Sequence, residues 1–190
     1  MNGLALFGGA FNPPHLTHQK IIAAAKEQLP VEEVVILPAG AHPHKQTPEH
    51  EMATAAARLE LCHLAFGDIP YVTIDDRELR RKGLSYTVDT LTELRNENPD
   101  ATLFWIIGSD NLPLLGTWHE PDKILELATI VTYPRKGYET RLQGPGITLD
   151  ITADDASASA IREALRSGRQ PEGLDLRVLD RIRQLGLYGT

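Results

Sequence analysis

The stretch Leu4–His18, LALFGGAFNPPHLTH, places a short apolar run directly before two glycines, two prolines and two histidines. An apolar run at 4–7 that stops at a pair of glycines is typical of a buried strand that ends in a tight turn. His15 and His18 are three residues apart, which puts them on one side of the first turn of a helix. The stretch therefore predicts a strand, a loop and a helix, with polar groups gathered at the carboxyl end of the strand.

The same alternation continues along the chain. Apolar runs typical of buried strands cover residues 34–38, 71–74, 103–107 and 129–133. Helical spacing of apolar residues covers residues 15–29, 55–66, 86–97, 161–168 and 176–186. Near-continuous apolar strands that alternate with helices indicate a parallel sheet covered on both faces. We expect one domain over residues 1–190: an α/β, doubly wound, Rossmann-like parallel sheet with helices on both faces and a helical C-terminal segment. Residues 134–146, rich in glycine and proline, are expected to form a surface loop.

Composition narrows the class of protein. The chain has 190 residues, of which 42% are apolar and 24% charged, values typical of one globular domain. No apolar run approaches the roughly 20 residues of a membrane-spanning helix, and no signal segment precedes the first strand. The single cysteine, Cys62, excludes an intramolecular disulfide, and its place beside Ala55, Leu59 and Phe66 on one predicted helix face favours an inert buried role. These features predict a cytoplasmic protein that binds no membrane.

The net charge sets a condition on the substrate. At −7 it argues against a nucleic-acid-binding protein, which would carry a basic stripe. An anionic small molecule would have to be held by a local cluster of donors, together with a metal ion, against an unfavourable overall field. The composition leaves both a monomer and a homo-oligomer open.

The loop after the first strand suits a phosphate group. Gly8 and Gly9 allow close approach of the backbone, and the helix N-terminus that follows offers free N–H groups and a favourable dipole. His15 and His18 would add two imidazole donors. Two other interpretations stay open: a capped turn with surface histidines, and a zinc site, although no third ligand is evident. The loop matches neither a P-loop nor a dinucleotide-binding fingerprint.

Four further clusters of polar residues that could bind a ligand follow predicted strands or precede a predicted helix. PAGAHPHK (38–45) brings His42, His44 and Lys45, and SYTVDTL (85–91) offers Ser85 and Thr87, which could instead cap a helix. IIGSDNLPLLGTWHE (106–120) offers Asp110, suited to accept hydrogen bonds from ribose hydroxyls, and Trp118, suited to stack on a planar ring or to fill the core. SASAIR (157–162) offers Ser157 or Ser159 as an N-cap and Arg162 as a phosphate ligand.

Together these motifs resemble a known family. GGxFxPxHxxH after the first strand and a serine-rich cap before Ile-Arg are similar to the HxGH and ISSTxxR motifs of the nucleotidyltransferase superfamily. PHK (43–45), SYTVDTL (85–91) and GSDN…W (108–118) narrow the resemblance to the bacterial nicotinate-mononucleotide adenylyltransferases, over nearly the whole chain. The resemblance implies adenylyl transfer from ATP to nicotinate mononucleotide, which gives nicotinate adenine dinucleotide and pyrophosphate in NAD biosynthesis, with Mg²⁺ accompanying ATP and no dedicated metal site on the protein.

The resemblance also implies roles for individual residues. The implied catalytic groups are His15, His18 and Arg162. ATP is expected to contact Gly8, Gly9, Ala10, Phe11, His15, His18, Gly108, Asp110, Ser157, Ser159 and Arg162. The mononucleotide is expected to contact Asn12, His44, Lys45, Thr87 and Trp118.

Four positions depart from the family pattern. Asn12 replaces the usual Asp, which removes a negative charge beside the phosphates, and Thr17 replaces the usual Gly of HxGH. Ser159 stands for Thr, and His119 stands where Tyr is frequent. None of these changes removes a phosphate-binding group, so an active enzyme is expected.

Four alternatives are weighed against this interpretation. A pantetheine-phosphate adenylyltransferase would have no clear use for the SYT segment or Trp118, and the chain length and the lack of a KMSKS-like loop exclude a class I aminoacyl-tRNA synthetase. A nucleotide-binding regulatory module without turnover is favoured only by Asn12 and Thr17. An HxxH metalloprotein would bind zinc through His15 and His18.

Overall fold

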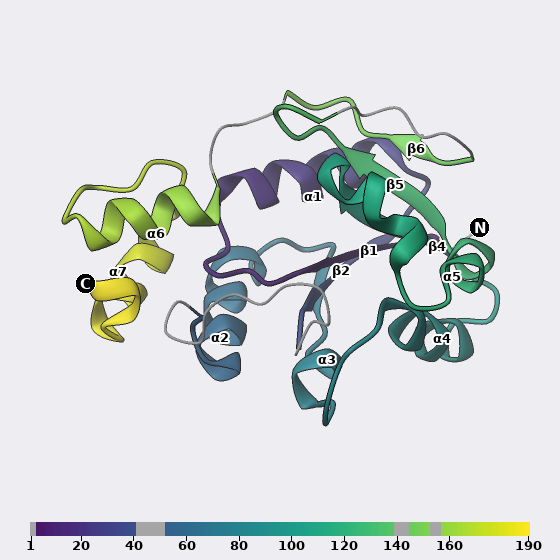
Figure 1. The fold of residues 1–190 in the computed structure, drawn as a ribbon, viewed down its shortest axis with the longest axis horizontal. Coiled ribbons are helices and arrows are strands. Elements are labelled where there is room, and N and C mark those ends of the chain that lie inside the picture. Colours follow the sequence, from purple (N-terminus) through teal and green to yellow (C-terminus); the bar gives the residue numbers. More distant parts are fainter. Residues whose placement is uncertain (1–2, 41–51, 139–144, 153–156) are drawn as a thin grey trace.

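Six strands form one parallel sheet in the order β3-β2-β1-β4-β5-β6 in this computed structural model, which describes residues 3–40, 52–138, 145–152 and 157–190 (Figure 1). The strands are β1 (Gly3–Gly9), β2 (Glu33–Pro38), β3 (Val72–Ile74), β4 (Thr102–Gly108), β5 (Thr129–Tyr133) and β6 (Ile147–Thr148). The first five confirm the predicted runs. β1 pairs with both β2 and β4, so the strand order reverses there and the carboxyl ends of β1 and β4 flank a natural ligand-binding crevice.

Helices lie between most of the strands and follow the last one. The α-helices are α1 (Leu16–Gln28), α2 (Ala55–Phe66), α3 (Arg77–Arg80), α4 (Thr87–Glu97), α5 (Pro121–Leu127), α6 (Ala158–Arg166) and α7 (Leu176–Gln184). Two 3₁₀ segments are η2 (Ser109–Thr117) and η3 (Leu187–Gly189). The sequence did not predict α3, α5, η2 or β6, because they are short and because Pro113 inside η2 is typical of a loop.

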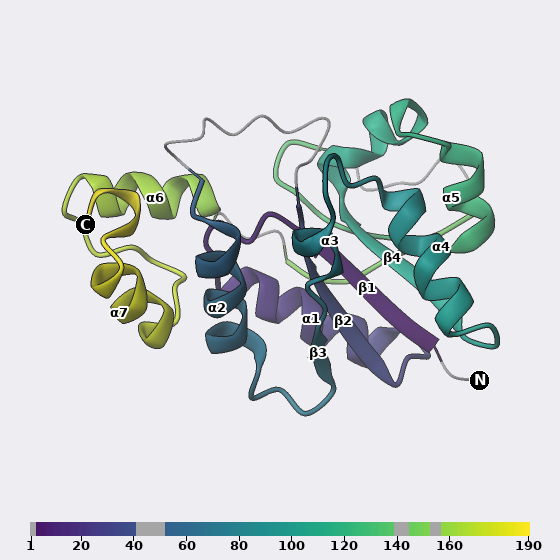
Figure 2. The same ribbon diagram turned by 90° about the horizontal axis from the view of Figure 1, so that it is seen from below.

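The two faces of the sheet carry separate cores. Leu6 of β1 belongs to a core cluster with residues of α4 and α5, whereas its neighbour Phe7 belongs to a second cluster that includes residues of α1, α2, α6 and α7. The two side chains differ in this way because successive side chains of a strand point to opposite faces. Figure 2 shows α4 and α5 toward one end of the molecule and α6 and α7 at the other. This arrangement confirms the doubly wound fold.

Helix α2 buries a different face from the predicted one. Cys62 and Phe66 are buried as expected, but Ala55 is exposed and Leu59 only half-buried. Arg58 is buried instead, with 5% of its surface exposed. Burial raises the pKa of the Cys62 thiol to about 12, so this thiol stays protonated and inert.

The C-terminal helices attach to α2. Arg181 of α7 holds Glu60 at 2.7 Å, and the hydroxyl of Ser157 caps α6 by accepting a hydrogen bond from the Ala160 backbone N–H at 3.2 Å. The start of helix α6 faces the loop after β1, where Arg162 contacts the backbone of Asn12. Within the described part of the chain, no helix is long and apolar enough to cross a membrane.

Candidate functional site

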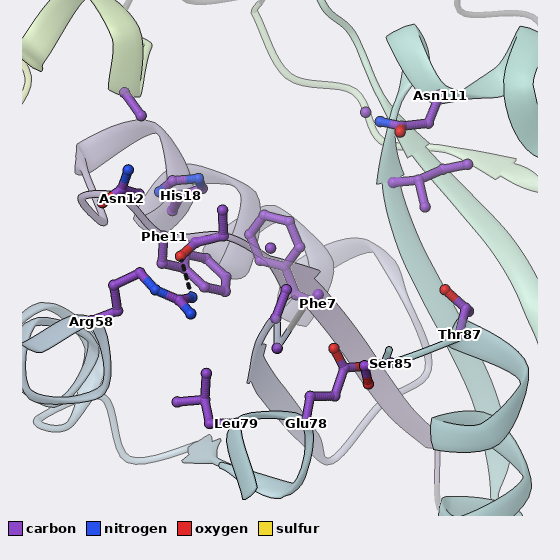
Figure 3. A pocket seen from close by; sticks show the side chains of 18 of the residues that line it. Phe7, Phe11, Asn12, His18, Arg58, Glu78, Leu79, Ser85, Thr87 and Asn111 are labelled. Carbon is purple, nitrogen blue, oxygen red and sulfur yellow. Dashed lines mark hydrogen bonds between the residues drawn. The ribbon is translucent and has the colours of Figure 1, made fainter. Parts of the chain in front are cut away.

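A cavity of about 930 Å³ lies at the carboxyl ends of β1 and β4. Its wall is shared by the loop after β1 and by the first turns of α1, α2, α4 and α6. Figure 3 shows Asn12, His18 and Arg58 at one end of this cavity. Ser85 and Thr87 lie toward the other end (Figure 3). The switch point of the sheet thus carries the site, as expected for an open parallel sheet.

His15 and His18 form the start of α1. His15 is the N-cap residue, and its ring centroid lies 3.8 Å from that of His18, so the two side chains lie on one side of the helix start, as predicted. The backbone N–H of His15 donates to Nδ1 of His18 at 3.1 Å. This bond occupies one helix-terminal donor and fixes the orientation of the His18 ring.

The protonation state of His18 follows from its surroundings. Burial lowers the pKa of His18 well below its ordinary value of 6.5, and the positive charges of His15 and Arg135 lower it further. His18 is therefore neutral near pH 7, and its single proton must reside on Nε2 because Nδ1 accepts a hydrogen bond. His18 presents an N–H donor to the cavity.

Two buried arginines hold the loop between β1 and α1. Arg58 donates from Nη1 to the carbonyl oxygen of Ala10 at 2.8 Å, and Arg162 donates from Nη1 to that of Asn12 at 2.9 Å. Within the described residues no carboxylate lies within salt-bridge distance of Arg58, and burial lowers its pKa. A desolvated guanidinium beside the cavity favours an anionic ligand.

Close packing explains the residue types in this loop. A Cβ on Gly8 would lie 3.1 Å from the Trp105 ring, and one on Gly9 would lie 3.2 Å from the Phe11 ring. Phe11 has a φ of 45°, a left-handed conformation that is costly for a non-glycine residue. Its ring stacks edge-on against Phe7 and His18, which holds this conformation in place.

The opposite end of the cavity contains a buried carboxylate. Glu78 accepts a hydrogen bond from the Thr90 hydroxyl at 2.8 Å, and burial raises its pKa. Arg81 binds the hydroxyls of Ser85 and Thr90 and forms an ion pair with Glu93 at 2.8 Å. This network fixes the segment that enters α4.

Neither serine nor threonine caps α4. The N-cap is Tyr86, which makes no side-chain capping bond, so the capping alternative for Ser85 and Thr87 is wrong. Thr87 and the half-buried Trp118 both line the cavity. His119 instead stacks on Tyr86, with ring centroids 4.5 Å apart, and does not line the cavity.

The end of β4 supplies a further acidic group. A Cβ on Gly108 would lie 2.3 Å from Oδ1 of Asp110, so only glycine leaves room for this side chain to fold back. Arg135 lies 3.4 Å from Asp110, and its backbone N–H donates to the Ser109 hydroxyl at 2.9 Å. Asp110 is therefore held at the rim by a cation that also faces His18.

Most of the predicted site residues meet at this cavity. Those that line it are Gly8, Gly9, Ala10, Phe11, Asn12, His15, His18, Thr87, Gly108, Asp110, Trp118, Ser159 and Arg162. Ser157 does not line it, because its hydroxyl caps α6, and His44 and Lys45 lie outside the described residues. The sequence analysis missed Arg58, Glu78, Arg81 and Arg135, which follow no local motif and lie on helices or in a loop.

A protein-built metal centre finds little support in the described residues. Within them, no three His, Cys, Asp or Glu side chains gather closely enough to hold a metal ion. His15 and His18 form a pair, and Nδ1 of His18 already accepts a backbone hydrogen bond. The zinc alternative therefore lacks a third ligand in this part of the chain.

Comparisons with known proteins agree with the geometry. The sequence profile of the cytidylyltransferase-like family matches residues 6–164. A protein of Streptococcus pyogenes serotype M3 named "Probable nicotinate-nucleotide adenylyltransferase" is 36% identical over 186 residues, which cover 97% of this chain and 88% of that protein.

Solved structures share the fold. The Plasmodium falciparum nicotinic acid mononucleotide adenylyltransferase in complex with APC superposes with a TM-score of 0.80 at 14% identity, covering 99% of this chain and 98% of that one. Its complex with NaAD superposes with a TM-score of 0.78 at 15% identity and the same coverage.

The state of His18 can be measured directly. In an NMR titration of the folded protein, we expect the His18 ring, assigned by the loss of its signal in His18→Gln, to titrate at a lower pKa than in the urea-unfolded chain. Because the folded pKa lies below the unfolded one, this group reduces the free energy of unfolding as the pH falls below about 6.5. A folded pKa at or above the unfolded value would contradict the burial argument.

Proposed function

The chain belongs to the cytidylyltransferase-like family, in its nicotinate-nucleotide adenylyltransferase branch, and on that premise we propose that it transfers the adenylyl group of ATP to nicotinate mononucleotide. The products are nicotinate adenine dinucleotide and pyrophosphate. The observation that carries the proposal is the single cavity between β1 and β4, with phosphate donors at one end and a ring-binding wall at the other. NaAD, which occupies the Plasmodium structure with the same fold, has the chemical identity of this product.

The reaction needs placement more than proton transfer. A phosphate oxygen of the mononucleotide attacks the α-phosphorus of ATP and forms a new P–O bond. The bond between that phosphorus and the α–β bridging oxygen breaks, and pyrophosphate leaves with the electron pair. Because the attacking phosphate is already ionised near pH 7, no general base is required, and catalysis rests on alignment and charge stabilisation.

The histidines and Arg162 stabilise the phosphates of ATP. His18 offers its Nε2–H to the α-phosphate or the bridging oxygen, where negative charge develops. His15 lies against the His18 ring and shares this end of the cavity, and Arg162, beside Ser159, holds the β- and γ-phosphates. Ser157 supports this subsite through the cap of α6 rather than by lining the cavity.

Glycine residues and Asp110 receive the adenosine. Gly8, Gly9, Ala10 and Phe11 form the wall against which the nucleotide lies, and Gly108 allows close approach at the end of β4. Asp110 accepts hydrogen bonds from ribose hydroxyls there. Its distance of 3.4 Å from Arg135 leaves a carboxylate able to accept further donors.

The mononucleotide occupies the end formed by α4 and η2. Trp118 stacks on the pyridine ring, and Thr87, at the first position of α4, recognises the ring carboxylate near the helix N-terminus. Asn12 contacts the phosphate from the opposite side, and His44 and Lys45, outside the described residues, bind the same group. Selectivity for nicotinate over nicotinamide then rests on Thr87 and its neighbours, since His119 packs against Tyr86.

Mg²⁺ enters with ATP. The ion prefers to keep several waters and to bind phosphate oxygens with one or two carboxylates, so it requires no cage of protein ligands. Among the described residues the lining holds no group of three such ligands, which fits an ion held mainly by phosphate oxygens and water. When bound, Mg²⁺ neutralises charge on the leaving pyrophosphate.

Cytoplasmic location and self-association stay predictions from the sequence.

A pyrophosphate-release assay tests the proposal. The protein is incubated with ATP, Mg²⁺ and one acceptor at a time: nicotinate mononucleotide, nicotinamide mononucleotide or phosphopantetheine. We expect the fastest release with nicotinate mononucleotide and loss of activity with EDTA. Preference for phosphopantetheine would establish the neighbouring transferase activity instead. ATP binding by calorimetry without release under any condition would identify a regulatory module.

Removal of either proposed phosphate-stabilising group should lower kcat. We expect His18→Ala and Arg162→Ala each to reduce kcat by on the order of 10²-fold, the scale of losing one donor to a developing charge. His63→Ala and Arg169→Ala, the same changes at exposed helix or loop positions, serve as controls. Circular dichroism checks that each variant is folded, and parent-like turnover by a folded variant would refute the role of that residue.

Substitution of Trp118 separates the two substrates. Trp118→Ala removes a stacking surface, so KM for the mononucleotide should rise about tenfold while KM for ATP changes little. Leu114→Ala, at an exposed position of the same segment η2, should leave both constants unchanged. Equal increases in the two KM values would argue against ring stacking.

A further inference from the structure

Tyr188 reaches the catalytic loop from the far end of the chain. It lies in η3, and its hydroxyl donates to Oδ1 of Asn12 at 2.7 Å across 176 residues of sequence. Figure 2 shows the C-terminus folded beside α6. Asn12 lines the cavity two residues after Ala10 and three before His15. A residue outside every recognised motif therefore contacts the phosphate-binding loop.

The Asn12 side chain has one orientation. Its Oδ1 also accepts a hydrogen bond from the backbone N–H of Ala53 at 3.0 Å. Because a backbone N–H can only donate, this contact identifies the amide oxygen, and the Tyr188 bond agrees with the assignment. Two donors on one oxygen fix the plane of this side chain at the wall of the cavity.

Tyr188 acts as a donor and does so through Asn12. Burial raises the pKa of the Tyr188 hydroxyl well above its ordinary value, so the proton stays on the oxygen. Tyr188 lines a separate cavity of about 380 Å³, which shares Ala53 and Arg162 with the main one, and it does not line the main cavity itself. Contact with the substrates is thus left to Asn12.

The backbone of this turn is held in an unusual conformation. Tyr188 has a φ of 60°, in the left-handed region that tyrosine rarely adopts. Its ring packs against the core cluster that contains Phe11 and Phe66. A backbone conformation of this energy persists only where surrounding contacts hold it. Here the conformation brings the Tyr188 hydroxyl to Asn12.

We propose that Tyr188 is a positioning residue, whose hydroxyl holds the Asn12 side chain, and with it the loop after β1, in the arrangement that the bound substrates require. The inference rests on the proposed adenylyl transfer and adds a residue to it. Both contacts end on an oxygen, so the Asp of the family pattern would accept the same two donors, and Asn keeps them without a negative charge beside the phosphates.

A set of substitution cycles tests the inference in the pyrophosphate assay. Tyr188→Phe removes only the hydroxyl and should lower kcat/KM about three- to tenfold, the scale of one hydrogen bond. In an Asn12→Ala background, which lacks the acceptor, the same change should leave kcat/KM at the value of the Asn12→Ala single variant. In an Asn12→Asp background, which keeps an acceptor oxygen, the change should again lower kcat/KM three- to tenfold relative to Asn12→Asp alone.

Matched controls separate positioning from stability. Tyr71→Phe, at another partly buried tyrosine packed on the same core cluster, should keep parent kinetics. KM for ATP and for nicotinate mononucleotide, measured separately, shows which substrate depends on the position of Asn12, and an increase in either supports the inference. A Tyr188→Phe loss of equal size in all three backgrounds would mean a general structural role and overturn it.

The two proposals fail in different ways. If the parent protein releases no pyrophosphate, the proposed function is wrong. If the parent is active and Tyr188→Phe matches it, the function stands and the positioning role of Tyr188 is refuted.

Discussion

Two guanidinium groups hydrogen-bonded to backbone carbonyls hold the loop on which the site depends. Arg58 binds Ala10 and Arg162 binds Asn12, from helices on either side of the loop. Carbonyl oxygens satisfy donors but do not neutralise a charge, so the contact from Arg58 fixes the loop without cancelling the positive charge of that guanidinium. The same contacts that order the protein therefore prepare it for a polyanionic ligand. They also explain how a chain with a net charge of −7 can attract ATP.

The neutrality of His18 fits this electrostatic setting. A further full positive charge beside Arg135 would raise the electrostatic cost of folding, and burial keeps the imidazole neutral instead. A neutral ring with its proton on Nε2 still donates a hydrogen bond to a phosphate oxygen. Because Nδ1 accepts the His15 backbone N–H, the ring meets the triphosphate as a neutral donor, and arginine side chains supply the positive charge.

Sequence reasoning located the site because parallel strands impose their geometry on it. Once LALF at 4–7 is a strand of a parallel sheet, its glycines, His15 and His18 must lie at the carboxyl edge, and the cavity is there. Arg58 could not be found in this way, since an arginine on a helix is usually exposed and the apolar pattern of α2 pointed to Ala55 rather than Arg58. Tyr188 is harder still, because 176 residues separate it from Asn12 and only tertiary packing brings them together. Short elements such as α3 carry Glu78 without any periodic signal.

The two departures within the loop differ in consequence. Thr17 is buried and does not line the cavity, and among the described residues its hydroxyl makes no hydrogen bond, so it acts on the packing of α1 rather than on the ligand. Asn12 lines the cavity, and its Oδ1 accepts hydrogen bonds from the Ala53 backbone N–H, two residues before α2, and from the Tyr188 hydroxyl in η3. A carboxylate there would accept the same bonds but repel phosphate, whereas the amide accepts them and carries no charge. The departure at Asn12 therefore preserves the scaffold of the loop and removes a negative charge beside the substrate.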